Sequence, residues 1–185
     1  MMGLHRNSSV ESRCIRRLGA GALIAVLWSA AALAQAQGEG CDTAQSHQFD
    51  FWVGKWSVSP AGHPDRRVAE SLIEKLYRGC GVRENWMPLK GGPGGSLSAY
   101  DSAAHRWRQA WVDSSGAFAE FKGGWNEKAM VLTGVWPQPG HPRQVTRMTY
   151  TPASDGSVRQ SGETSDDAGR SWQPSFDFIY RRARP

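Results

Sequence analysis

The sequence predicts an all-β protein, an antiparallel up-and-down barrel of about ten strands. Short segments rich in valine, threonine and aromatic residues alternate with turn signals such as Ser114-Ser115-Gly116. Residues 49–58, FDFWVGKWSV, place two tryptophans around Gly54, where the backbone can bend or approach another strand closely. An even number of strands with short turns favours a barrel, because closure removes unpaired edges. A β-sandwich is the alternative.

The expected elements are ten strands and no helix beyond a turn near residues 43–47. Their limits follow from the glycine and proline signals that separate them. The expected strands span residues 51–59, 67–77, 81–87, 95–101, 106–113, 117–124, 128–136, 143–151, 156–164 and 171–181.

Alternation along the strands assigns an inner and an outer face. In the fifth strand, Trp107, Gln109 and Trp111 share one side, and Arg106 and Arg108 share the other. We expect the tryptophan side to face inward. The arginine side would cost several kcal/mol per residue in lipid, so the pattern argues against a membrane-embedded barrel.

The N-terminal 36 residues have the pattern of an export signal. An arginine-containing segment is followed by an apolar run over residues 18–33 and by small-residue cleavage sites near residue 36. We expect a cleaved signal peptide over residues 1–36 and a single barrel domain over residues 37–185, periplasmic or secreted. A membrane anchor is the alternative, but the run of about 16 residues is shorter than the roughly 20 that a spanning helix needs.

The charge of the whole chain, +5 at pH 7, comes from its two ends. Residues 1–36 carry four arginines and one glutamate, which leaves 18 basic and 16 acidic residues in the mature chain. The C-terminal tail holds three more arginines, so residues 37–180 are close to neutral. Nucleic-acid binding needs a basic face that reaches phosphates. We therefore expect no nucleic-acid partner.

The cysteines predict a disulfide. Cys14 leaves with the signal, so Cys41 and Cys80 remain as an even pair in an oxidising compartment. A metal or thiol site is the alternative, but histidine or cysteine partners are missing from the sequence around them.

A series of motifs runs along residues 41–181. These motifs are Phe49-Asp50-Phe51-Trp52, Gly54-Lys55-Trp56, Gly79-Cys80, Glu84, Trp86, Tyr100-Asp101, Trp107 to Asp113, Leu132-Thr133-Gly134, Arg147, Asp155 to Gln160, Glu163, Trp172 and Phe176-Asp177. Together they resemble an uncharacterised family of exported bacterial proteins with a calycin-like, or lipocalin-like, β-barrel. That family has no established activity, so the resemblance implies a fold and a compartment only.

A more distant likeness is to nitrobindin-like barrels, which share the ten-strand plan. The resemblance would imply haem held by a histidine on a late strand. The histidines of the mature chain, His47, His63, His105 and His141, all fall in predicted turns or loops. We therefore expect no haem or other cofactor, and no metal, because histidine, cysteine and acidic residues lack ligand spacing.

Aromatic and polar residues on the predicted inner face form the candidate ligand site. Arg147 is placed inside because it matches the family pattern, and a buried arginine needs a carboxylate partner, for which Glu84 and Glu163 are the candidates. The polar residues are alternatively a structural network that closes the barrel. The candidate ligand-binding residues are Trp56, Glu84, Trp86, Trp107, Gln109, Trp111, Arg147 and Glu163.

These observations predict an exported barrel that binds a small, largely apolar or amphipathic molecule in its lumen. One alternative is an envelope or protein-interaction module with a filled barrel. Another is an enzyme, an isomerase or a hydrolase, that uses a lumenal carboxylate as acid or base. No catalytic nucleophile arrangement stands out in the sequence, so no catalytic residue is assigned.

Overall fold

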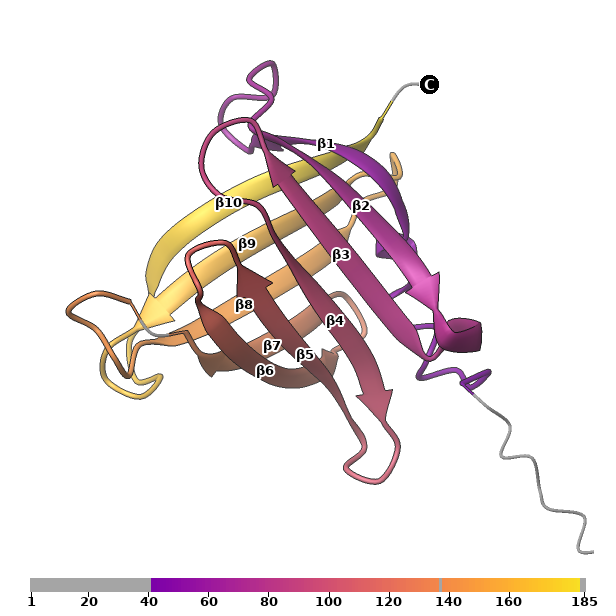
Figure 1. Ribbon diagram of the computed structural model, residues 1–185. Coiled ribbons are helices and arrows are strands. Elements are labelled where there is room, and N and C mark those ends of the chain that lie inside the picture. The colour runs from indigo at the N-terminus through magenta and orange to yellow at the C-terminus, as the bar shows by residue number, and fades with distance from the viewer. Residues whose placement is uncertain (1–40, 137, 184–185) are drawn as a thin grey trace, which may run out of the picture. The chain divides into compact units, whose positions relative to one another are not determined.

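A computed structural model describes residues 41–136 and 138–183 (Figure 1). It confirms the all-β class and the up-and-down barrel. Each strand pairs antiparallel with the next one along the chain, and the first strand pairs with the last to close the barrel. The strands are β1 (Gly54–Pro60), β2 (Ala69–Leu76), β3 (Gly81–Pro88), β4 (Gly94–Asp101), β5 (Arg106–Asp113), β6 (Phe118–Trp125), β7 (Met130–Val135), β8 (Val145–Pro152), β9 (Val158–Ser165) and β10 (Gln173–Arg182).

The inner face follows the alternation expected from the sequence. In β5, Trp107 and Gln109 are buried and Trp111 is half-buried, whereas Arg106 and Arg108 are exposed. A shift of one residue would bring both arginines into the core, so the pattern fixes the register of this strand.

The start of the barrel differs from the expectation. The first strand was expected from residue 51, but Asp50–Trp52 form a 3₁₀ turn, η1, and β1 begins at Gly54. The reason is the packing of Trp52, which is fully buried under the barrel instead of in its wall. Gly54 makes the sharp return possible, because its φ is +145° and a Cβ there would overlap the guanidinium of Arg182.

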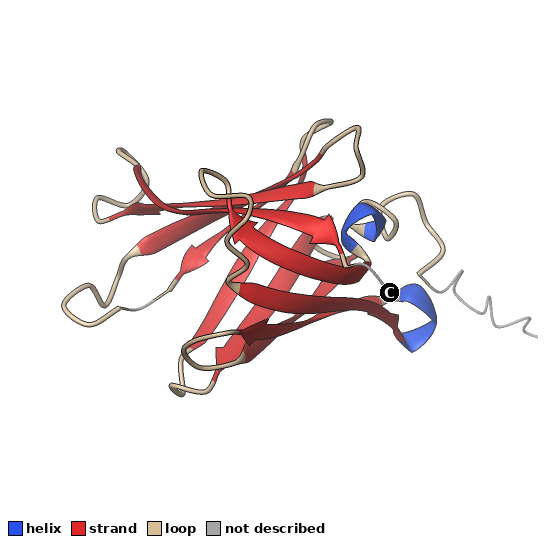
Figure 2. Cartoon of the chain, turned by 90° about the horizontal axis from the view of Figure 1, so that it is seen from above, coloured by secondary structure: helices blue, strands red, loops and turns tan. Residues whose placement is uncertain are grey.

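Aromatic side chains close one end of the lumen, which we call the closed end. Here Phe49 packs at 5.0 Å from Trp52, 5.6 Å from Trp107 and 5.0 Å from Tyr150, measured between ring centroids. Figure 2 shows the two short helical turns, η1 and η2 (Tyr77–Gly79), at the same end of the barrel. The N-terminal arm therefore acts as a plug.

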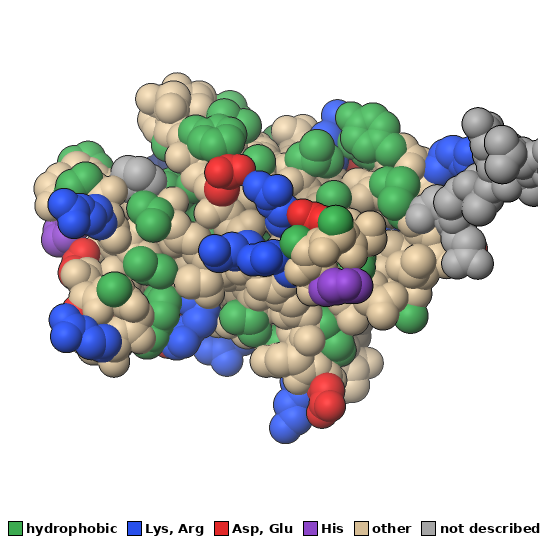
Figure 3. All heavy atoms as spheres, turned by 90° about the horizontal axis from the view of Figure 1, so that it is seen from below, with side chains coloured by type: hydrophobic (Ala, Val, Ile, Leu, Met, Phe, Trp, Pro, Cys, Tyr) green, Lys and Arg blue, Asp and Glu red, His purple; other side chains and the backbone are tan. Residues whose placement is uncertain are grey.

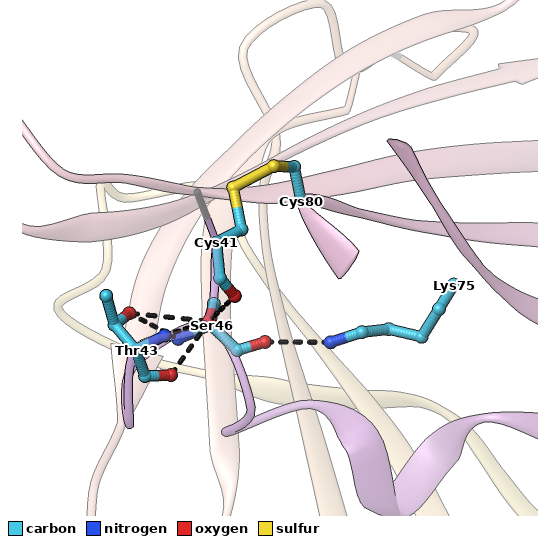
Figure 4. The surroundings of a disulfide bond; sticks show 5 residues. All are labelled: Cys41, Thr43, Ser46, Lys75 and Cys80. Carbon is cyan, nitrogen blue, oxygen red and sulfur yellow. Dashed lines mark hydrogen bonds between the residues drawn. A yellow bond between two sulfur atoms is a disulfide. The ribbon is translucent and has the colours of Figure 1, made fainter. Parts of the chain in front are cut away.

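The Cys41–Cys80 disulfide attaches this arm to the barrel and confirms the predicted pairing (Figure 4). The Cα atoms of the two cysteines are 4.7 Å apart. Beside them, the Lys75 ammonium at the end of β2 donates to the carbonyl oxygen of Ser46 at 3.0 Å and pairs with the Asp50 carboxylate. Covalent and polar links thus hold the plug in place.

The outer face carries charges of both signs. Figure 3 shows a face on which Lys and Arg lie among Asp, Glu and hydrophobic side chains. Within residues 41–136 and 138–183, no helix is long and apolar enough to cross a membrane. The predicted export signal, residues 1–36, lies outside the described residues.

Candidate ligand-binding site

A cavity of about 160 Å³ lies in the lumen beyond the aromatic plug. Its walls come from six strands and from the segment that follows β7, and most of the side chains are aromatic. The cavity is lined by Glu84, Trp86, Gln109, Trp111, Phe121, Trp136, Met148, Tyr150, Gln160, Phe176, Phe178 and Tyr180. Of these, Trp136 lies in the segment after β7.

Two aromatic clusters form the upper walls of the cavity, at what we call the open end. In one cluster, Trp86 of β3 lies 5.7 Å from Phe178 of β10, which stacks on Phe176 at 5.5 Å. In the other, Trp136 lies 5.8 Å from Trp111 of β5 and 5.9 Å from Phe121 of β6.

The open end differs from the plug in exposure. Trp86, Trp111, Trp136, Phe176 and Phe178 are all partly exposed, although they pack against the buried core. Glycine makes room for one of them, because a Cβ at position 162 of β9 would overlap the ring of Phe176. The cavity therefore has apolar walls that reach toward solvent.

Glu84 on β3 supplies the carboxylate in the cavity. Its side chain is 4% exposed. Its Oε1 accepts hydrogen bonds from Ser71 at 3.0 Å and Tyr180 at 3.3 Å, and its Oε2 accepts one from Ser96 at 3.5 Å. These partners come from three different strands, β2, β4 and β10, so the barrel wall holds the carboxylate from several sides.

Burial raises the pKa of Glu84 to about 7 from an ordinary value of 4.5. Loss of hydration disfavours the charged form, and the hydrogen bonds from Ser71, Tyr180 and Ser96 offset only part of that effect. Both the protonated and the ionised form of Glu84 are therefore accessible near neutral pH. A carboxylic acid poised in this way can give or take a proton under physiological conditions.

The hydroxyl of Tyr180 links Glu84 to Gln160. Its oxygen is 2.6 Å from Oε1 of Gln160 and 3.3 Å from Oε1 of Glu84. A tyrosine has one hydroxyl proton, so it can donate to only one of these acceptors fully. When Glu84 is protonated, its own proton can be donated to the Tyr180 hydroxyl oxygen, and the Tyr180 proton can stay directed toward Gln160. When Glu84 is ionised, the proton of Tyr180 can turn toward it.

The structure brings four of the eight predicted site residues to the cavity. Glu84, Trp86, Gln109 and Trp111 line it. Gln109 is held by a hydrogen bond from its Nε2 to the Ser98 hydroxyl at 2.9 Å.

Two other predicted residues, Trp56 of β1 and Trp107 of β5, pack against the plug at the closed end. Each is 1% exposed, and neither lines the cavity. The indole nitrogen of Trp56 donates to the carbonyl of Trp52 at 2.8 Å, and that of Trp107 donates to Gln48 at 3.1 Å. These contacts fix the arm against the closed end.

The expected lumenal position of Arg147 and Glu163 is wrong. Both residues lie on the outer face, where the Nη2 of Arg147 is 2.7 Å from Oε2 of Glu163. The expected ion pair forms, but on the outer face of the barrel, where about one third of each side chain is exposed. The Arg147 guanidinium lies 4.1 Å from the ring centroid of Trp172. Met148 and Tyr150 point inward from β8 instead. Burying Met148 and Tyr150 costs far less than burying the charged Arg147, so their face of β8 turns inward.

Eight lining residues were not among the predicted site residues. Alternation along the strands provides the signal for several, because Phe176, Phe178 and Tyr180 share one face of β10. Trp136 lies just after β7, although the strand expected from the sequence, residues 128–136, includes it. The remaining four unpredicted lining residues are Phe121, Met148, Tyr150 and Gln160.

No protein-family model matches the chain. No curated protein matches it at a significant level either. Among residues 41–136 and 138–183, no group of three or more His, Cys, Asp or Glu side chains is arranged to hold a metal ion.

Proposed function

We propose that this protein is an exported calycin-like barrel that binds a small, largely apolar molecule in the open half of its lumen. The observation that carries the proposal is the cavity of about 160 Å³, with aromatic walls around a buried carboxylate. Specific small-molecule sites commonly combine apolar walls with a few polar groups that orient the ligand.

The size of the cavity limits the ligand. It is close to an apolar cavity of about 150 Å³ that binds benzene in another protein, and it is smaller than the roughly 300 Å³ at which drug-sized sites begin. A single ring or a short aliphatic chain with one polar group fits this volume. The cavity also supports ligand binding over an interaction module whose barrel is filled by its own side chains.

Export is part of the proposal. The Cys41–Cys80 disulfide supports it, since disulfides persist in oxidising compartments and are rare in the cytosol. The signal-like pattern of residues 1–36 points the same way.

Native mass spectrometry of the protein purified from its own host tests the proposal. We expect a second species whose added mass corresponds to one small organic molecule. The Trp86→Ala variant should lose this species, because Trp86 forms part of one aromatic wall. The proposal would be overturned if the protein carries no adduct and its tryptophan fluorescence does not change on addition of any of a panel of ring-sized compounds.

A second candidate function, acid–base catalysis, is favoured by one observation. Glu84 combines a pKa raised to about 7 with a place at the cavity and a tyrosine hydroxyl 3.3 Å away. Such a pair can remove a proton from a carbon next to a carbonyl and return it, as an isomerase does. Deuterium uptake by cyclohexanone in heavy water, followed by NMR, should then be faster with the wild type than with Glu84→Gln. Equal rates would remove this candidate.

A further inference from the structure

The cavity has an acidic character in addition to its apolar walls. Among its lining residues, Glu84 is the one side chain that ionises near neutral pH, and none is a lysine, arginine or histidine. Burial and neutral hydroxyl donors set the pKa of Glu84, and no charged side chain contributes to it among the described residues. Within the described part of the chain, the site therefore contains a buried acid without a positive partner.

The carboxylate also keeps unused acceptor capacity. An ionised carboxylate has about four lone-pair positions, and Glu84 has three hydrogen-bond contacts in the described part of the chain. Oε1 carries two of them, whereas Oε2 has a single long contact of 3.5 Å with Ser96. A positively charged donor in the cavity would fill that place with a strong, charge-assisted hydrogen bond.

The aromatic walls favour the same kind of ligand. The faces of aromatic rings carry partial negative charge and attract cations within about 6 Å, tryptophan most strongly. Three tryptophans, Trp86, Trp111 and Trp136, surround the open half of the cavity. This fold already pairs cations with tryptophan elsewhere, since the Arg182 guanidinium lies 4.1 Å from the ring centroid of Trp56.

We infer that the ligand is a small organic cation, an amine attached to one ring or a short apolar chain, with its ammonium group on Oε2 of Glu84 and its apolar part between the tryptophans. This inference rests on the proposed function and names the ligand class for the same cavity. Anionic ligands are disfavoured, because they would meet a carboxylate and aromatic faces with no basic side chain.

Isothermal titration calorimetry, which measures the affinity for three probes of similar shape, tests the inference. Benzylamine carries a positive charge, benzyl alcohol none, and benzoate a negative one. With the wild type near pH 8 we expect benzylamine to bind about tenfold or more tightly than benzyl alcohol, and benzoate to bind weakest. Glu84→Gln should remove the preference for benzylamine and keep the affinity for benzyl alcohol. Glu120→Gln, the same change at an exposed carboxylate on the outer face of β6, should leave all three affinities unchanged.

The dependence of affinity on pH provides a second readout in the unmodified protein. Of the groups that face Glu84, Tyr180 and Tyr150 also titrate, but burial keeps their pKa values raised, so both stay neutral. An ammonium favours the ionised form of Glu84, so benzylamine affinity should increase as pH rises from about 5.5 to about 8. Benzyl alcohol should show no such increase.

The outcomes separate this inference from the proposed function. Benzyl alcohol binding as tightly as benzylamine would overturn the cation inference and leave the apolar binding site standing. Tighter binding of benzoate would overturn it too. If none of the three probes binds, the cation inference fails, and the native mass spectrum decides separately whether the barrel carries a ligand of another kind.

Discussion

The two ends of this barrel use the same residue type in opposite ways. At the closed end, Trp52, Trp56 and Trp107 are fully buried in the core cluster that includes Phe49, and two of the three indole nitrogens have hydrogen-bond partners among the described residues. At the open end, Trp86 and Trp111 remain partly exposed and line a cavity. Tryptophan therefore fills the core at one end and lines a cavity at the other.

The difference arises from what covers each end. The N-terminal arm folds under the closed end, and a disulfide and the Lys75–Asp50 ion pair hold it there. At the open end the described chain supplies only the aromatic clusters themselves. Between the two lies a layer of buried polar side chains that includes Glu84, Gln109 and Gln160. One end is thus tightly packed, whereas the other keeps a cavity.

The largest expected contrast between the ends comes from truncating one tryptophan in each. Trp107→Ala removes a buried ring that contacts Phe49 and Tyr100, so it should lower the free energy of unfolding by about 3–5 kcal/mol. Trp86→Ala should cost about half as much or less, because its ring is partly exposed. Urea unfolding monitored by circular dichroism measures both. Equal losses would mean that the ends do not differ as described.

Removing the disulfide sharpens the account of the plug. The bond closes a loop with a sequence separation of 39 residues, so the Cys41→Ser, Cys80→Ser double variant should lose up to about 4 kcal/mol in the chain-entropy model. Thiol titration of the unreduced, denatured wild type should find neither cysteine reactive. Detection of reactive thiols at Cys41 and Cys80 would contradict the link between the arm and the barrel.

The buried acid should make stability depend on pH. Glu84 has a folded pKa of about 7 against an ordinary 4.5, so the folded state holds the proton more tightly. The free energy of unfolding should therefore fall as pH rises from about 4.5 to about 7, by about 3 kcal/mol in total. Below that range the group is neutral in both states and contributes nothing.

Glu84→Gln should lack this decline. Comparison with the wild type isolates the effect, because His47 is present in both proteins and its raised pKa, caused mainly by hydrogen bonds to Asp50 and Asp42, titrates in an overlapping range. Denaturant titrations at several pH values measure the difference. Parallel curves for the two proteins would show that Glu84 is not a destabilising buried acid.

The smallest effect is expected at Trp52. Its Nε1 is buried without a hydrogen-bond partner among the described residues. Trp52→Phe removes that donor, which offsets part of the lost ring area. The change in the free energy of unfolding should be about 1 kcal/mol or less, well below that of Trp107→Phe, which would also break the hydrogen bond to Gln48. A larger loss at Trp52 would mean that its indole nitrogen has a partner after all.

The closure of the barrel and the inner face of β5 were predictable from the sequence, because turn signals and alternation depend on local residue patterns. The disulfide followed from the parity of the cysteines. The plug was not predictable in this way. Phe51 and Trp52 look like the start of a strand by composition, and only contacts with distant residues such as Tyr150 and Tyr180 turn this segment into a 3₁₀ turn.

The candidate site was only half predictable for a related reason. Alternation separates the two faces of a strand but does not say which face is the inner one. In β8 the family resemblance favoured the side of Arg147, whereas the physical cost of burying an arginine favours Met148 and Tyr150. The position of each side chain along the barrel axis could not be predicted from the sequence either, since it depends on how neighbouring strands are staggered. Trp107 and Trp111 lie on one face of one strand but at opposite ends of the lumen.

The most direct test follows the indole N–H signals of ¹⁵N-labelled protein during a titration with benzylamine. Eight tryptophans follow residue 36, so both ends of the barrel report in one spectrum. The account predicts that the signals of Trp86, Trp111 and Trp136 shift with the added probe and that those of Trp52, Trp56 and Trp107 stay in place. Shifts confined to the closed-end tryptophans, or a spectrum unchanged by benzylamine and benzyl alcohol alike, would contradict it.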